Sequence, residues 1–252
     1  MGQPTLTPRV KEYLSAPVLE DVLLEAQMLA LTFVTGIEDA ITFPDFHCFV
    51  SNQTGNTVML AIAASSISPT IVSLPYIATS LSMFVLGGCV IGQLGNFLGC
   101  RRRGWLILSS IVQTILVFAA SWLQFMHTGS DHTKAADLGV IALLAVSASG
   151  QVAMARSLRM TEITTANATS AYVDTFIDVN LYKFQNRSRN RRFLFLLSLC
   201  GGSFVGAFMY LKLGSPLTLL IAAAGKTLVT ITLFFNTEIE SLNPALTLTT
   251  VV

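Results

Sequence analysis

Long apolar stretches alternate with short polar connections along most of the chain. Two shorter stretches, 53–67 and 164–179, are rich in Ser, Thr, Asn and Ala and do not comfortably span a bilayer. A helix needs about 20 apolar residues to cross a hydrocarbon core of about 30 Å. Six stretches meet this length: 22–43, 72–99, 105–127, 137–157, 193–213 and 216–235. The pattern predicts six long transmembrane helices and two short broken or re-entrant helices.

Composition leads to the same class of protein. Only 12% of the 252 residues are charged, against roughly a quarter in soluble proteins, and 52% are hydrophobic. The segment 46–100 contains no formal charge at all. These values exclude a soluble domain, a disordered chain and a disulfide scaffold. The net charge of +1 also argues against a nucleic-acid partner. The expected partner is the lipid bilayer, in a multi-pass arrangement.

The order of long and short stretches repeats: long, short, long, long, and then the same again. Glycines support an internal repeat, because four pairs of them share one spacing along the chain. The pairs lie 114 residues apart: Gly36 with Gly150, Gly87 with Gly201, Gly88 with Gly202, and Gly92 with Gly206.

Basic connections predict the topology. Arg101–Arg103 follow one long stretch, and five cations lie between 183 and 192. Cytoplasmic loops collect Lys and Arg, and both connections face the cytoplasm only if the two short stretches do not cross. Six crossings then remain, three in each half, and the two repeats are inverted.

This topology divides one membrane domain into five parts. Both termini are expected in the cytoplasm. The parts are a cytoplasmic N-terminal segment (1–21), a first repeat (22–127), a loop (128–136), a second repeat (137–236) and a cytoplasmic tail (237–252).

Three charges inside predicted spans are candidates for chemistry. Glu38 and Asp39 lie in the first span, where acids are costly and usually mark a pathway or an ion pair. Alternatively, that helix ends near Gly36 and the two acids face water. Lys226 lies midway along the last span, and Glu38 or Asp39 would be a suitable charge partner. Pro44 is expected to break or end the first helix, which makes Asp45 a capping or turn residue.

A polar motif separates the first long stretch from the first short one. It is Ser51-Asn-Gln-Thr-Gly-Asn-Thr57. Asn52 and Asn56 would share one helix face, and with Gln53 and Thr54 they could bind a small molecule or ion at a broken helix. An equally good interpretation is that these side chains satisfy interrupted backbone and bond neighbouring helices.

The corresponding part of the second half supplies the remaining candidates. Gln151, Thr165 and Asn167 are uncharged polar residues at similar places in the repeat. Arg156 is either part of the same site or an interfacial side chain that extends toward water.

Several other chemistries find no support. The four cysteines and three histidines show no metal or redox spacing, and neither a catalytic constellation nor a dinucleotide fingerprint is present. We therefore expect no enzyme activity, cofactor or metal. Gly88-xxx-Gly92, Gly95-xxx-Gly99 and Gly202-xxx-Gly206 are interpreted as internal helix packing, with homodimerisation as the lesser alternative.

The motifs resemble a known family. Thr35-Gly-Ile-Glu-Asp-Ala40 and Phe49-Val-Ser-Asn-Gln-Thr-Gly-Asn-Thr57 are similar to the signature of YoaK-like membrane proteins, a family of unknown function. Phe43–Phe49, Gln151–Arg156 and Asn186–Arg192 resemble its fungal branch. The resemblance implies no established substrate, and association with small-metabolite handling only through neighbouring genes.

Together these features predict an all-α polytopic membrane protein. The leading hypothesis is a transporter or permease for a small, unidentified solute, which works by alternating access. The alternative is a non-transporting membrane scaffold that gathers pathway enzymes through its basic loops. Asp39, Asn52, Gln53, Thr54 and Asn56 would bind the solute from one half, and Gln151, Arg156, Thr165 and Asn167 from the other.

Overall fold

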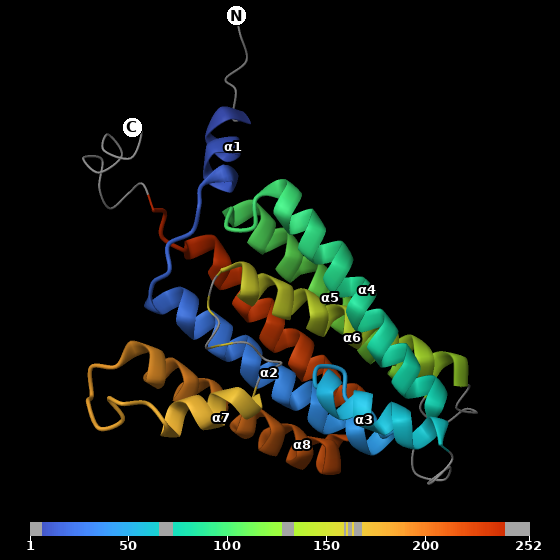
Figure 1. Ribbon diagram of the computed structural model, residues 1–252. Coiled ribbons are helices and arrows are strands. Elements are labelled where there is room, and N and C mark those ends of the chain that lie inside the picture. Colours follow the sequence, from blue (N-terminus) through green and yellow to red (C-terminus); the bar gives the residue numbers. More distant parts are fainter. Residues whose placement is uncertain are drawn as a thin grey trace, which may run out of the picture.

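The computed structural model describes residues 7–65, 73–127, 134–158, 160, 163 and 168–239. Within these ranges the fold is all-α, and its helices lie side by side in one bundle (Figure 1). The helices are α1 (Thr7–Ser15), α2 (Val22–Phe46), α3 (Gln53–Ala64), α4 (Leu74–Leu98), α5 (Arg103–His127), α6 (Lys134–Ser157), α7 (Ala168–Phe176), α8 (Arg187–Thr232) and the 3-10 helix η2 (Leu233–Phe235).

Four helical segments are long and apolar enough to cross a membrane: α4, α5, α6 and Arg187–Phe235. Their outer surfaces fit a lipid environment, since large apolar side chains such as Val85, Phe97 and Leu211 are exposed. Helix α2 is as long as α4 and α5, with 25 residues, but it carries internal acids. The protein is therefore a membrane-type helical bundle.

Helix α8 is two helices joined at a sharp reversal. Gly214 has φ +76° and ψ 171°, a conformation that glycine adopts without strain, and Pro216 follows it. The first half of α8 (187–213) and the second half (215–232) run in opposite directions beside α2 (Figure 1). The break agrees with the predicted boundary between 193–213 and 216–235.

Contacts along α2 establish these directions. Glu25 near the start of α2 meets Arg191, and Asp45 near its end bonds Tyr210, so α2 is parallel to the first half of α8. Gln27 bonds Asn236, beyond the end of the second half, so the second half runs antiparallel to α2.

Helix α6 likewise lies beside one parallel helix, α4, and one antiparallel helix, α5. Tyr76 and Gly87 of α4 meet Asp137 and Ser149 of α6, respectively, so these helices are parallel. Helix α5 runs antiparallel to both α6 and the second half of α8. Consequently α6 runs opposite to α2. The short helices lie outside this core, α3 against α4 and α7 against α8.

The two basic connections lie at one end of the bundle. Arg103 binds Glu238 at 2.7 Å, and Arg191 binds Glu25 at 2.6 Å. The Gln27–Asn236 bond, 2.7 Å long, joins these two corners. Helix α1 covers the same end, where the Tyr13 ring lies 4.0 Å from the Arg103 guanidinium.

Two sequence interpretations of α2 are wrong. The helix does not end near Gly36 but continues to Phe46, and it closes only where His47 adopts a left-handed conformation with φ 52°. Pro44 lies inside the last turn without ending the helix. Glu38 and Asp39 are consequently helical and inside the bundle, because the packing of α2 on α8 maintains the helix past both positions.

Candidate functional site

The interior of the bundle is unusually polar. In a membrane protein, polar side chains within the helices usually face the protein, where they can find partners. The buried polar residues of the central helices include Thr32, Thr35, Glu38, Ser110, Gln113, Thr114, Ser147, Gln151, Lys226 and Thr230.

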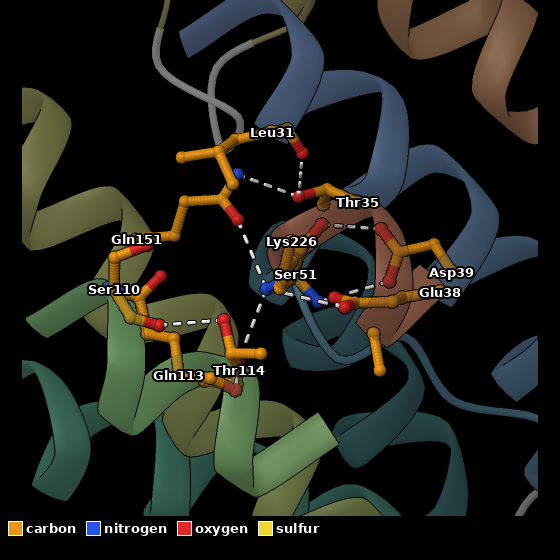
Figure 2. Close-up of polar contacts among 12 residues, drawn as sticks. Leu31, Thr35, Glu38, Asp39, Ser51, Ser110, Gln113, Thr114, Gln151 and Lys226 are labelled. Carbon is orange, nitrogen blue, oxygen red and sulfur yellow. Dashed lines mark hydrogen bonds and ion pairs between the residues drawn. The ribbon is translucent and has the colours of Figure 1, made fainter. Parts of the chain in front are cut away.

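An acid and a base lie at the centre of this interior. Lys226 Nζ is 3.3 Å from Glu38 Oε1, and their side chains are 1% and 0% exposed. The two residues come from α2 and from the second half of α8. Figure 2 shows the pair meeting between these helices, with α5 and α6 nearby.

Helix α6 completes the environment of the lysine. The Lys226 ammonium donates to Ser147 Oγ at 3.0 Å and to Gln151 Oε1 at 3.2 Å. The Gln151 amide then donates to Thr35 Oγ1 at 2.8 Å, which returns the network to α2 (Figure 2). A chain of polar contacts thus links both halves of the sequence.

Helix α5 adds uncharged polar groups beside the pair. The Ser110 and Thr230 hydroxyls lie 2.7 Å apart, and the Ser147 hydroxyl donates to the backbone carbonyl of Gln113 at 3.2 Å. Among the central residues named here, only Glu38 and Lys226 carry formal charge. The arrangement can bind a small polar or charged solute through donors and acceptors, and it can hold or release a proton at Glu38.

Asp39 points away from this pair. Its Oδ1 accepts from the Val50 and Ser51 amides at 3.0 and 3.1 Å, and its Oδ2 accepts from the Ser51 hydroxyl. These bonds hold the α2–α3 connection, residues 47–52, against α2. Successive residues of a helix point about 100° apart, so Glu38 and Asp39 serve different places.

The polar side chains of the 51–57 motif bond mainly the backbone of the same α2–α3 connection. Asn56 accepts from the Phe49 amide at 3.0 Å and donates to the Phe49 carbonyl at 2.6 Å. Gln53 donates to the Val50 carbonyl at 3.0 Å and to Ser80 of α4 at 3.2 Å. Backbone that leaves a helix needs such partners when water is absent. The motif therefore supplies hydrogen-bond partners to the non-helical backbone between α2 and α3.

The other two motif residues lie near the surface. Asn52 is exposed and caps α3, where its Oδ1 accepts from the Gly55 amide at 3.3 Å. Thr54 is also exposed. Neither side chain joins the Glu38–Lys226 pair.

Of the second-half candidates, only Gln151 is seen in the centre. Arg156 lies in the last turn of α6 with an exposed side chain, apart from the pair. Thr165 and Asn167 lie outside the described residues.

Sequence reasoning missed three residues of the central network. Thr35, Gln113 and Ser147 are each almost completely buried in the middle of an apolar stretch. That position was the available signal, because a polar residue at membrane depth usually faces a partner. Their own neighbours could not be read from one sequence.

Asp45 also has a different role from the one expected. It caps no helix, but accepts from Tyr210 at 2.8 Å and from Gln124 at 2.7 Å, and it also bonds Ser215. It therefore ties the end of α2 to α5 and to the α8 reversal. A capping interpretation was wrong because Pro44 does not end α2.

Comparison with known proteins adds a family. Neither a curated protein nor a solved structure matches the chain. A family model described as "Protein of unknown function (DUF1275)" matches residues 27–232, which include α4, α5, α6, α8, α2 from residue 27 onward, and the central pair. The chain, a membrane-type helical bundle around a buried ion pair, therefore belongs to the DUF1275 family of proteins of unknown function.

Proposed function

We propose that the chain is a membrane permease for a small solute and that it works by alternating access. The observation that carries this proposal is the Glu38–Lys226 pair, buried at 0% and 1% exposure among polar side chains of four long helices. Intramembrane charges of this kind usually mark a solute or ion pathway. The closed surroundings fit an occluded state between two open ones.

Contacts between the helices support inverted repeats. Helix α2 packs on α8 with Ile37 against Gly206, and α6 packs on α4 with Gly150 against Ile91. At the 114-residue spacing, Gln151 corresponds to Ile37, which precedes Glu38, and Lys226 corresponds to Val112, which precedes Gln113. The opposite directions of α2 and α6 make the repeats antiparallel. Transporters often bind solute at such a repeat interface.

The full topology belongs to the same proposal. Six crossings would come from α2, α4, α5, α6 and the two halves of α8, with both termini and both basic connections in the cytoplasm. The repeats would comprise 22–127 and 137–236. Membership of the YoaK-like fungal branch stays a prediction.

Single cysteines test this topology. In a background without the four native cysteines, R102C and K183C should react with a membrane-impermeant maleimide only after cells are permeabilised. K212C should react in intact cells, because Lys212 lies near the opposite end beside the Gly214 reversal. Labelling of all three positions from one side would contradict six crossings.

Solute entry tests transport itself. Purified protein in liposomes is exposed to gradients of glycerol, potassium pyruvate or tetramethylammonium chloride, and swelling is followed by light scattering. At least one class should enter faster than in protein-free liposomes, and E38Q/K226Q should lose that acceleration. The K212Q variant, which removes an exposed lysine, is the matched control. No acceleration with any class would refute transport.

The scaffold alternative has less support. Its proposed docking loop is already engaged within the chain: Arg191 binds Glu20 and Glu25, and Arg192 lies 3.6 Å from Asp178. Pull-down of soluble proteins, lost when 187–192 is neutralised, together with an absence of solute entry, would favour the scaffold instead.

A further inference from the structure

We propose that the Glu38–Lys226 pair is a binding site for a small monocarboxylate and that each carboxylate is carried with one proton. This inference rests on the proposed transport function and names its substrate class and coupling ion. Glu38 would act as the internal substitute for the solute carboxylate. When a solute takes its place at Lys226, Glu38 becomes neutral.

The lysine side of the site is built to hold one carboxylate. An ammonium has three donors, and Lys226 directs two of them to Ser147 and Gln151 of α6. The third side faces Glu38 at 3.3 Å. Because Ser147 and Gln151 are neutral, the lysine charge is balanced by one monovalent anion, whereas a dianion would leave an excess negative charge in the bundle.

The glutamate side is poorly held. Within the described residues neither Glu38 oxygen accepts a hydrogen bond, although both are buried. Asp39 next to it receives three hydrogen bonds from residues 50 and 51. A carboxylate without hydrogen-bond partners is easier to displace from its cation than one that is fully bonded. Glu38 is therefore the exchangeable acid, and Asp39 is the fixed one.

The groups that bear electrostatically on Glu38 are few. Lys226 faces it from α8, and Asp39 follows it on α2. The groups that α6 and α5 contribute around the pair do not titrate: they are the side chains of Ser147 and Gln151 and the backbone carbonyl of Gln113. When a solute carboxylate neutralises Lys226, Glu38 can avoid an unpaired buried charge only by taking up a proton.

The binding step balances in atoms and charge. The solute carboxylate R–COO⁻ forms an ion pair with the Lys226 ammonium, which remains protonated. A proton from water on the open side adds to the Glu38 carboxylate and gives Glu38–COOH. Release on the other side reverses both events, so one anion and one proton cross together and no net charge moves.

Size follows from the packing around the pair. Glu38, Ser147, Gln151 and Lys226 are all at most 2% exposed, so a solute bound at Lys226 is enclosed by protein in the closed state, which favours a short solute. The solute class is therefore a short monocarboxylate.

Pyruvate is a suitable probe, because it carries one carboxylate and is small. Liposomes containing the protein and an internal pH dye are given external radiolabelled pyruvate. Uptake should acidify the interior with about one proton per pyruvate. A potassium diffusion potential of either sign should leave the rate unchanged, because the step is electroneutral.

Variants separate the two roles. K226Q should reduce pyruvate uptake to the level of protein-free liposomes. E38Q should retain pyruvate binding but lower the acidification per pyruvate at least tenfold, and its uptake should become sensitive to potential. E38Q/K226Q, which lacks both charges, should still fold, which separates loss of the pair from loss of the fold. K212Q and E12Q remove exposed charges and should behave like the wild type.

Infrared spectroscopy observes the proton directly. Addition of pyruvate to the reconstituted wild type should produce the carbonyl band of a protonated carboxyl group, and that band should be missing in E38Q. A merely structural Glu38 would not give this difference.

The outcomes distinguish the inference from the proposed function. Entry of glycerol or tetramethylammonium without entry of pyruvate would overturn the carboxylate site and leave the permease standing. If no solute enters, transport is refuted, and the infrared band decides the site. A band that depends on Glu38 supports a carboxylate site, and no band overturns it.

Discussion

Removal of one partner of the central pair should be far more damaging than removal of both. In K226M, Glu38 keeps its completely buried position but loses its cation. Breaking a buried ion pair in this way typically costs about 3–5 kcal/mol, whereas replacing the whole pair by neutral side chains is often nearly neutral. We therefore expect the unfolding free energy of E38Q/K226M to lie within about 1 kcal/mol of that of the wild type.

Protonation sets an upper limit on the cost. Neutralising a carboxyl group of ordinary pKa, about 4.3, costs about 3.7 kcal/mol at pH 7. This value bounds the loss expected for K226M, because Glu38 can be neutralised by protonation.

The stability of K226M should also depend on pH. Folding of K226M takes up a proton at Glu38, so its stability should rise as pH falls from 7 toward about 4.3, by about 1.4 kcal/mol per unit.

Reversible unfolding in mixed micelles measures these quantities, with Trp105 and Trp122 as fluorophores. Trp105 is 6% exposed and Trp122 is 67% exposed, so unfolding should change the emission of the first most. Losses below about 1 kcal/mol in both single variants, or a double variant as unstable as the sum of the two, would refute the charged buried pair.

Two further predictions concern packing and the helix break. A methyl group at Gly202 would overlap the Phe33 carbonyl oxygen, so G202A should lose at least about 1–3 kcal/mol in the same unfolding assay. G92A has open space and should lose nothing; equal losses in both would contradict the close contact of α2 and α8. N56A strands the Phe49 backbone groups and should cost about 2–3 kcal/mol, while T57A, at an exposed position, should stay within about 0.5 kcal/mol. Similar losses of unfolding free energy in N56A and T57A would contradict the role of the motif in bonding the α2–α3 backbone.

Much of the architecture could be predicted from the sequence because lipid imposes a simple pattern. Apolar length alone located α4, α5 and α6 within a few residues, and Gly214-Ser-Pro216 marked the reversal inside α8. The short stretches became α3 and α7, which are indeed too short to cross.

The candidate site was harder to predict because it depends on which way side chains point. Asp39 and Asn56 have the composition of a binding site, but their partners are backbone groups of the α2–α3 connection, whose path no sequence pattern describes. From the sequence, either Glu38 or Asp39 could have paired with Lys226. Only the rotation of α2 about its axis directs Glu38 toward the lysine. The sequence thus identified polar residues inside apolar helices, and the structure showed which partners each of them bonds.

The distance in sequence between Glu38 and Lys226 also constrains how the molecule is made. Ribosomes produce α2 well before the second half of α8. During that interval the acid lacks its cation, and in apolar surroundings a neutral carboxyl group is the less costly form. Arrival of Lys226 then closes the bundle, so a prematurely terminated chain exposes an orphan acid that membrane quality control can recognise.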